Sequence, residues 1–198
     1  MSLIEALLLG LVQGLTEFLP VSSSGHLAIL KNLLQIKETG IIFSVLLHTG
    51  TLAVLLAAFR QDVKKLLLEG CKTIYDFAGN FTIYFKNRHE QEAIRYKKLI
   101  SNNYRKLFLL LLVSTLPTAV EGILLEDLVL QAESNLLAPA IGLFITGIFL
   151  LVIDFFPAGK KITKDVGYGT AFFIGIFQGI AVFPGISRLG ITVVVCTM

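Results

Sequence analysis

Two stretches of this 198-residue chain repeat nearly the same pattern of glycine, glutamine, proline and serine. Each pattern breaks an otherwise apolar sequence, which indicates an internal duplication. The first copy adds Glu17, a serine run and His26, whereas the second adds Arg188, so the copies look like complementary halves of one site. The matched residues are Gly10, Gln13, Gly14, Phe18, Pro20, Ser23 and Gly25, repeated with small shifts as Gly175, Gln178, Gly179, Phe183, Pro184, Ser187 and Gly190.

The composition is that of an integral membrane protein. Apolar residues make up 55% of the chain, charged residues 16%, and the mean hydropathy is +0.78, well above the range of soluble domains. Glu5 interrupts the first apolar run and no basic region precedes it, so we expect no cleavable signal. Cys71 and Cys196 have neither disulfide nor metal-ligand spacing and are interpreted as structural.

The basic residues are clustered. Eleven of the seventeen Lys and Arg residues lie between Arg60 and Lys106, which the positive-inside rule assigns to a cytoplasmic loop, residues 60–106. No nucleic-acid recognition motif accompanies them, so no nucleic-acid partner is expected.

Three apolar segments are long enough to cross a bilayer: Thr39 to Phe59, Leu107 to Leu125 and Leu137 to Phe156. The acidic loop Glu126 to Asn135 is then expected outside, and the loop with Lys160, Lys161 and Lys164 inside. The sequence predicts a single all-α polytopic domain with residues 1–136 as the first repeat and residues 137–198 carrying the third span and the second hairpin.

The remaining apolar segments are shorter and predict two re-entrant helical hairpins. These are Leu3 to Leu19 with Leu27 to Leu34, and Tyr168 to Phe183 with Ile191 to Met198. Their turns, Pro20 to Gly25 and Pro184 to Gly190, must be buried in protein because lipid cannot satisfy irregular backbone. Three spans between the hairpins make the repeats inverted, and helices starting near Gly25 and Gly190 would aim positive ends at a shared anion.

Polar residues within the hairpins are the candidate site. Gln13 and Glu17 share one helix face, and an ionisable residue in a membrane hairpin usually marks a site. The alternatives are an interfacial Glu17, turn-forming serines, a buried structural His26 and an Arg188 that extends to the interface. A guanidinium binds phosphate bidentately, which favours a functional Arg188. His48 and Glu121 are assigned to packing or to polar contacts between helices, and the Gly10–Gly14 and Gly175–Gly179 pairs to close packing.

Residues 10–26 closely resemble the first signature of bacterial undecaprenyl-diphosphatases, and residues 184–188 resemble the second. Segments 47–51 and 116–120 are also similar. Leu189 departs from the family's Ser-Arg-Ser-Gly pattern, and Gln13 fills a position where the family accepts Gln or Glu.

The resemblance implies a multi-pass enzyme of the bacterial cell membrane that hydrolyses undecaprenyl diphosphate, recycles the cell-wall lipid carrier and opens to the outer face. It implies contact with membrane lipids, leaves oligomers open, and implies a divalent cation, Mg²⁺ or Ca²⁺, bound by Gln13 and Glu17. The nucleophile is either Ser23 or a water. The catalytic set is Glu17, Ser23, His26 and Arg188, and the substrate-binding set is Ser22, Ser24, Gly25, Gly185, Ser187 and Thr192.

Two alternatives stay open at this point. Paired broken helices are also a transport architecture, so a polyprenyl-phosphate transporter or flippase could use the same residues. An inverted repeat also calls for about 60 to 75 more residues to complete three further spans, so an inactive truncated remnant is the second alternative.

Overall fold

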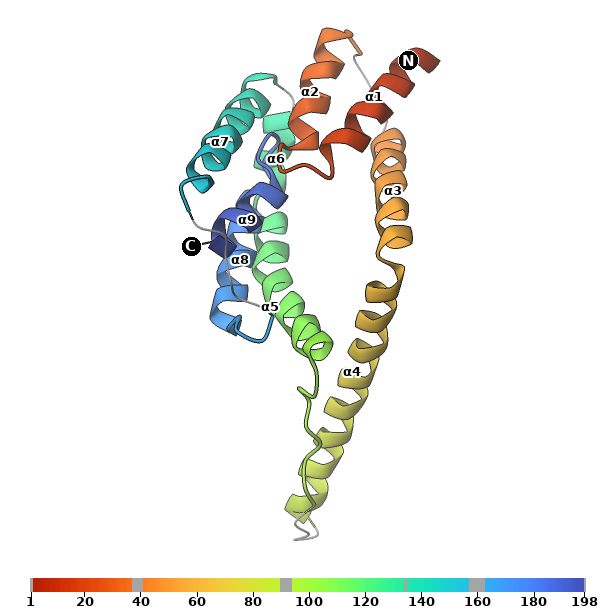
Figure 1. The fold of residues 1–198 in the computed structure, drawn as a ribbon, viewed down its shortest axis with the longest axis vertical. Helices are drawn as coiled ribbons and strands as arrows, with labels where there is room; N and C mark the ends of the chain where they lie inside the picture. Colours follow the sequence, from red (N-terminus) through yellow and green to blue (C-terminus); the bar gives the residue numbers. More distant parts are fainter. Residues whose placement is uncertain (1, 37–40, 90–93, 134, 157–162, 198) are drawn as a thin grey trace.

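The computed structural model describes residues 2–36, 41–89, 94–133, 135–156 and 163–197. Within these ranges the regular structure is entirely helical, as expected (Figure 1). The helices are α1 (Leu3–Thr16), α2 (Ser23–Leu33), α3 (Ile41–Ala58), α4 (Arg60–His89), α5 (Asn103–Leu124), α6 (Glu126–Glu133), α7 (Leu137–Ile153), α8 (Tyr168–Ile180) and α9 (Arg188–Thr197).

The two predicted hairpins are present as α1–α2 and α8–α9, each a pair of short helices joined by a turn. Their second helices begin at Ser23 and Arg188, two residues earlier than expected. Serine side chains cap both starts: Ser22 Oγ accepts from Gly25 N at 3.4 Å and Ser187 Oγ accepts from Gly190 N at 3.0 Å. The structural equivalent of Ser187 is therefore Ser22, and the sequence match to Ser23 was one residue out of register. The inversion of the two repeats stays a prediction.

The two turns are packed against each other. A Cβ on Gly25 would lie 2.9 Å from Gly185 Cα and 2.7 Å from Leu143 Cγ, and a Cβ on Gly190 would lie 3.2 Å from Pro20 O. Ser22, Gly25 and residues 184, 185, 187 and 190 are buried, while residues 24, 188 and 189 are exposed. The prediction that the turns lie inside the protein is thus confirmed where the turns contact each other and is wrong for the three exposed residues.

Helix α8 packs along α5, and the second glycine pair makes this close approach possible. A Cβ on Gly175 would collide with Ser114 O, and one on Gly179 would collide with Glu121 Oε2. Thr118 Oγ1 also donates to Gly175 O at 2.7 Å. The packing role predicted for Gly175 and Gly179 is confirmed, but the one predicted for Gly14 is wrong, because nothing lies within 4 Å of its Cβ position.

The prediction of three spans is only partly confirmed. Among the described residues, α5 alone is long and apolar enough to cross a membrane, and the number rises to three if α3–α4 and α6–α7 each count as one bent span. Helices α3 and α4 meet at 88°, and α7 has 17 residues. Lys160 and Lys161 lie outside the described residues. Lys106 Nζ donates to Lys164 O, so two basic segments predicted to share one side do lie together.

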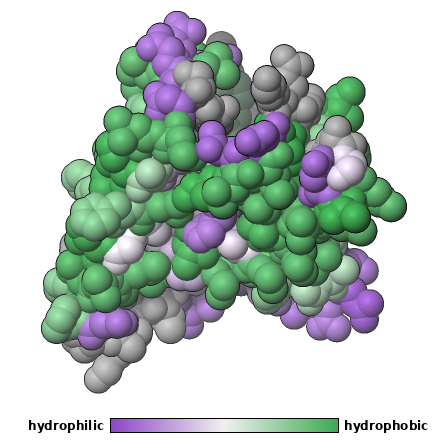
Figure 2. All heavy atoms as spheres, turned by 90° about the horizontal axis from the view of Figure 1, so that it is seen from above, coloured by the Kyte–Doolittle hydropathy of each residue, from purple (hydrophilic) through white to green (hydrophobic). Residues whose placement is uncertain are grey.

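The outer surface is strongly apolar. Large side chains such as Phe144, Phe155 and Ile123 are exposed on α7, just beyond it and on α5. Viewed from above, hydrophobic residues cover most of the visible face, and hydrophilic residues gather in separate groups (Figure 2). Such a surface matches a hydrocarbon environment.

The segment expected as a polar loop, residues 60–106, is not a loop. It forms the 30-residue helix α4, and residues 94–102 then run back along it to α5. Asn80 exchanges two hydrogen bonds with the backbone of Lys97, at 2.7 and 2.8 Å, and Asn87 does the same with Ile94 at 3.0 Å. The acidic loop 126–135 is likewise mostly helical, as α6. Both helices are polar, and they were expected to be loops because that expectation was based on hydropathy.

A buried arginine joins α4 to α5. Arg105 Nε donates to Glu69 Oε2 at 3.0 Å and its Nη1 donates to Asp76 Oδ2 at 2.8 Å. Hydrogen bonds from Lys72, Asn102 and Arg105 to the Glu69 carboxylate lower the pKa of Glu69 from 4.5 to about 2. Because the folded pKa is depressed, the stabilisation is complete above pH 4.5 and is lost as the pH falls through about 2.

We therefore expect the Glu69→Gln variant to unfold at a lower temperature than the wild type at pH 6, because it lacks the carboxylate that Arg105 and Lys72 bind. The difference in thermal midpoint should shrink as the pH is lowered from 4.5 towards 2, where the wild-type carboxyl also loses its charge. Circular dichroism in detergent micelles measures both midpoints. A difference that stays constant across this pH range would contradict the assignment.

The contact between the turns predicts a contrast between two glycine variants. Gly25→Ala places a Cβ against Gly185 and Leu143, and such overpacking costs about 1 to 3 kcal/mol. Gly14→Ala, in the last turn of α1 with open space around it, should be neutral or stabilising by up to about 1 kcal/mol. Thermal unfolding of the two variants in the same micelle is the measurement, and equal midpoints would rule out a tight contact between the turns.

Candidate functional site

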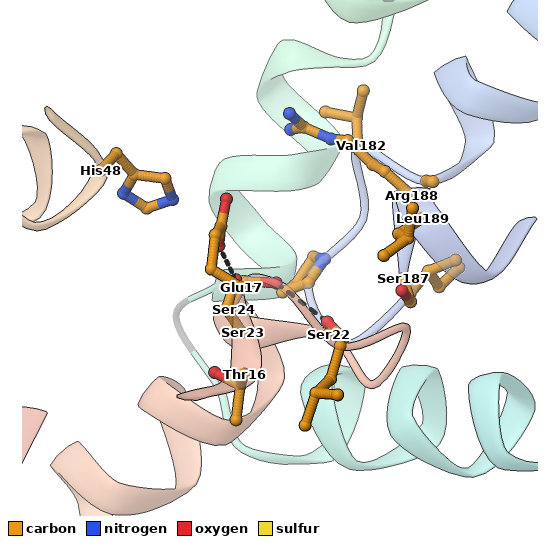
Figure 3. Close-up of a pocket in the computed structure, with 14 residues that line it drawn as sticks. Thr16, Glu17, Ser22, Ser23, Ser24, His48, Val182, Ser187, Arg188 and Leu189 are labelled. Carbon is orange, nitrogen blue, oxygen red and sulfur yellow. Dashed lines mark hydrogen bonds between the residues drawn. The ribbon is translucent and has the colours of Figure 1, made fainter. Parts of the chain in front are cut away.

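A cavity of about 330 Å³ opens between the two turns (Figure 3). Both hairpins contribute to it, together with one residue of α3. Its lining residues are Thr16, Glu17, Leu19, Ser22, Ser23, Ser24, His48, Ala181, Val182, Pro184, Ile186, Ser187, Arg188 and Leu189. Residues from opposite ends of the chain are thus brought to one site, as the duplicated pattern predicts.

The acidic side of the cavity is a short hydrogen-bonded chain. Gln13 Nε2 donates to Glu17 Oε2 at 3.0 Å, which confirms that the two side chains share a helix face. Ser23 Oγ donates to the same carboxylate oxygen at 2.5 Å. The Ser23 hydroxyl is therefore held on the group that is best placed to take its proton.

Gln13 has one atom without a hydrogen-bond partner. Its side chain is 1% exposed, and Oε1 is the buried side-chain atom in the described ranges that lacks a partner. Leaving a buried amide oxygen unpaired costs about 1 to 3 kcal/mol. An unpaired oxygen next to a carboxylate is a donor pair that a hard cation accepts.

Ser22 has an unusual backbone. Its φ is 63°, in the left-handed region that non-glycine residues rarely adopt. The carbonyl of Ser22 accepts from His26 Nδ1 at 2.9 Å, and its hydroxyl lies 3.2 Å from Ser24 Oγ. His26 is not among the residues that line the cavity; its contact instead holds the serine turn in shape.

The turn that carries Arg188 is anchored to α7 by a single buried hydroxyl. Thr146 Oγ1 donates to Gly185 O at 2.9 Å and accepts from Ser187 N at 3.0 Å. Gly185 has a φ of 90° and contacts α7 so closely that a Cβ would lie 2.9 Å from Leu143 N. Arg188 follows as the first residue of α9, and its exposed side chain borders the cavity.

Some predicted site residues hold the turns in place and do not line the cavity. Gly25 and Gly185 form the contact between the turns and are absent from the lining. Thr192 Oγ1 donates to Arg188 O at 2.8 Å and accepts from Gln178 Nε2 at 2.8 Å, so its hydroxyl is engaged within the α8–α9 hairpin. By contrast, Ser22, Ser23, Ser24 and Ser187 do line the cavity.

Sequence reasoning missed two residues of the site. Thr146 carried a signal, because it is the one polar side chain in the apolar segment 137–153. His48 was assigned to helix packing, yet it lines the cavity and extends from α3 towards it (Figure 3). Its position depends on how α3 packs against α1, which no local pattern encodes.

The charges around the cavity suit a phosphorylated ligand. Arg188 supplies a permanent positive charge and a bidentate donor, and serine hydroxyls supply further hydrogen bonds. No group of three or more His, Cys, Asp or Glu residues in the described part of the chain can bind a metal alone. Mg²⁺ commonly uses one or two carboxylates together with substrate phosphates and water; Glu17 offers one carboxylate in the cavity lining, while Gln13 is buried beside it and is not a lining residue.

The fold and the site define a helical membrane protein with a cavity, lined by Glu17, serines and Arg188, between two helical hairpins. Residues 6–198 match the family model described as bacitracin resistance protein BacA, and the chain belongs to that family.

The chain is similar to several curated undecaprenyl-diphosphatases. The chain is 40% identical to the undecaprenyl-diphosphatase of Alkaliphilus metalliredigens and 37% identical to that of Desulforapulum autotrophicum, in each case over 98% of this chain and 66% of the relative. It is 38% identical to undecaprenyl-diphosphatase 4 of Bacillus thuringiensis, over 98% of this chain and 62% of the relative. The chain therefore spans slightly less than two thirds of the length of these relatives.

The role of Thr146 can be tested by removing its hydroxyl. Thr146→Val leaves Ser187 N without its buried acceptor, which costs about 1 to 3 kcal/mol and loosens the Arg188 turn. We expect a lower thermal midpoint and faster trypsin cleavage after Arg188. Thr146→Ser keeps the hydroxyl and serves as the control. Unchanged cleavage in Thr146→Val would show that α7 does not hold this turn.

Proposed function

We propose that the protein is a membrane phosphatase that converts undecaprenyl diphosphate to undecaprenyl phosphate and inorganic phosphate. The observation that carries this proposal is that the Glu17–Ser23 pair and Arg188 border one cavity. The carboxylate can activate a hydroxyl, and the guanidinium can hold a phosphate. The names of the relatives support the same reaction.

The substrate class follows from the two kinds of residue that line the cavity. Arg188 and the serines suit a diphosphate, while Leu19, Val182 and Leu189 add apolar surface. Leu19 and Leu189 are also exposed on the apolar surface. This combination fits a lipid that carries a phosphate head group on a hydrocarbon chain. The head group would bind in the cavity, and the chain would lie in the surrounding membrane.

In the first step, Arg188 holds the terminal phosphate and Ser23 Oγ attacks its phosphorus, since Ser23 is hydrogen-bonded to Glu17 at 2.5 Å. Glu17 takes the hydroxyl proton, the bond to the bridging oxygen breaks, and undecaprenyl phosphate leaves. Water then attacks the phosphoserine and releases inorganic phosphate, and the proton on Glu17 returns to Ser23. A water held by Glu17 in place of Ser23 is the alternative nucleophile.

A divalent cation, Mg²⁺ or Ca²⁺, is part of the proposal. Glu17 and the unpaired Gln13 Oε1 would hold it. When bound, the cation would offset negative charge on the diphosphate. Gln13 orients Glu17 through its amide N–H, so the same side chain also positions the base.

The proposed setting is the bacterial cell membrane, with several spans and the cavity open to the outer face. The exposed apolar surface and the length of α5 support a membrane setting. The cluster of basic residues in 60–106 supports a cytoplasmic position for α4 by the positive-inside rule.

Phosphate release by the purified protein tests the proposal. With farnesyl or undecaprenyl diphosphate as substrate, we expect the wild type to release inorganic phosphate and EDTA to stop the release. Glu17→Ala and Arg188→Ala should each lower release at least about 100-fold, because each removes an electrostatic stabiliser of the transition state.

Arg60→Ala, an exposed arginine on α4, is the matched control and should keep normal turnover. Near-normal turnover in Glu17→Ala or Arg188→Ala would remove that residue from the mechanism. Lipid-dependent binding without release by the wild type would indicate a carrier, and neither binding nor release would indicate an inactive protein.

A further inference from the structure

We propose that one face of α4 binds the surface of an anionic lipid bilayer, so that this helix lies along the membrane surface. The face in question does not line the cavity. The proposal therefore goes beyond the proposed phosphatase function and does not depend on it.

The first argument is a row of exposed apolar side chains along α4, which we call the α4 stripe. It consists of Leu67, Ile74, Phe77, Phe81 and Phe85, which are between 47% and 63% exposed. Their spacing of three, four or seven residues places them on one side of the helix. Phe81 and Phe85 also contact each other edge to face, with ring centroids 4.9 Å apart. A continuous exposed apolar surface of this kind marks an interaction site.

The face of α4 that packs within the protein is a different one. Gly70 and Thr73 are buried, and Asn80 and Ile83 are half-buried. A Cβ on Gly70 would lie 2.8 Å from the ring of Phe108 on α5. With 3.6 residues per turn, this packed face lies about a quarter of a turn from the α4 stripe. Beyond its contact with α5, α4 extends past the other helices with the segment 94–102 beside it (Figure 1).

The direction of α4 is the second argument. Helix α3 is apolar and ends at Ala58, and α4 meets it at 88°. Helix α5, which is long and apolar enough to cross a membrane, begins at Asn103, and Tyr104 OH donates to Asp62 Oδ1 at 2.7 Å. The first half of α4 thus lies where α3 ends and α5 begins. A helix at right angles to a membrane-crossing helix runs along the membrane surface, and this direction brings an apolar stripe against lipid.

The charge around α4 selects an anionic surface. The segment 60–106 contains eleven Lys and Arg residues and five Asp and Glu residues. The acidic side chains of α4 are engaged within the protein, because Asp62 accepts from Tyr104, and both Glu69 and Asp76 accept from Arg105. The excess charge that this segment presents to its surroundings is therefore positive.

The basic residues of α4 are arranged around the stripe. Lys65 and Lys72 are exposed roughly half a turn from it, and Lys64 is exposed at its side. Arg88 is exposed at its far end, seven residues after Phe81. Apolar residues on one face and lysines on the other are the pattern of helices that lie in a membrane interface, and long basic side chains reach the headgroup phosphates. A lipid surface satisfies both features, since hydrocarbon lies directly beneath the phosphates.

Single tryptophans can locate α4, because the chain has none of its own. Phe81→Trp places the probe on the α4 stripe. Tyr75→Trp also replaces an exposed aromatic ring but lies about a third of a turn away, and Leu112→Trp on the exposed surface of α5 serves as the reference for the membrane interior. Each variant of the whole chain is reconstituted into vesicles of phosphatidylcholine and phosphatidylglycerol. The acyl chains carry bromine, which quenches tryptophan, either near the headgroup or near the chain end.

The fluorescence of Phe81→Trp should fall at least about twofold with bromine near the headgroup and less with bromine near the chain end, because interfacial helices enter only the outer acyl region. Leu112→Trp should show the reverse order. Tyr75→Trp should be quenched little by either lipid and should stay accessible to acrylamide in the water. Thermal midpoints of the three variants show whether they are folded.

The charge requirement is tested with the same probe. In vesicles of phosphatidylcholine alone, the quenching of Phe81→Trp by shallow bromine should decrease. High salt should weaken it in the mixed vesicles, because exposed charges are screened. Adding Lys64→Gln and Arg88→Gln to Phe81→Trp should reduce the difference between the two kinds of vesicle.

Each contrary result has its own meaning. A stripe tryptophan that is open to acrylamide and unquenched by lipid would show that α4 lies in water, and stronger quenching by bromine near the chain end would show that α4 crosses the bilayer. A probe shielded from both lipid and acrylamide, increasingly so at higher protein-to-lipid ratios, would show that a second copy covers the stripe. Equal quenching in both kinds of vesicle would overturn the preference for anionic lipid. None of these results bears on phosphate release, which tests the proposed function separately.

Discussion

The contact between the two turns is the constraint on which the site depends. Gly25 has no room for a Cβ because Gly185 Cα would lie 2.9 Å away, and Gly185 has none because it packs directly on Pro139 and Leu143 of α7. The approach is fixed from behind by α7, where Gly142 also lacks room: a Cβ there would lie 2.9 Å from Gly185 Cα. With larger residues at these three positions the hairpins would separate, and Glu17 and Arg188 would no longer border one cavity.

Close packing of irregular backbone in an apolar surrounding requires that its polar groups be paired. Side-chain hydroxyls perform this task in both turns. Ser22 and Ser187 cap α2 and α9, Ser24 Oγ accepts from Gly185 N at 3.4 Å, and Thr146 binds both Gly185 and Ser187. The serine-rich sequence is thus partly structural. Ser23 differs from the others because its hydroxyl is bound to a carboxylate.

The sequence predicted those features of the fold and the site that depend on residues close together in the chain. Proline, glycine and serine mark the turns, and the spacing of Gln13 and Glu17 places them on one face of α1. These features are local, so a pattern within one turn of helix is enough to find them. The duplicated pattern also predicted that residues about 165 positions apart lie at one site, because the first copy has the carboxylate and the second has the arginine.

What the sequence did not predict depends on long-range packing. The helix α4 is polar overall and was taken for a loop; it is stabilised by Arg105 and by the returning segment 94–102, which lie far along the chain. His48 reaches the cavity only because α3 packs beside α1. Thr192 looked like a ligand-binding hydroxyl, but its bond to Gln178 engages it within the hairpin.

The matched glutamines of the two copies, Gln13 and Gln178, make different contacts. Gln178 Nε2 donates to Thr192, a neutral hydroxyl that also holds the start of α9. Gln13 Nε2 donates to Glu17, a charged group beside the cavity, and its Oε1 is left without a partner. In the second copy, Gln178 therefore helps to hold the arginine turn. In the first copy, Gln13 leaves one amide oxygen available to a ligand. In the proposed mechanism the second copy supplies the arginine and the first copy supplies the carboxylate and the serine hydroxyl, and the contact of Gly25 with Gly185 holds the two together.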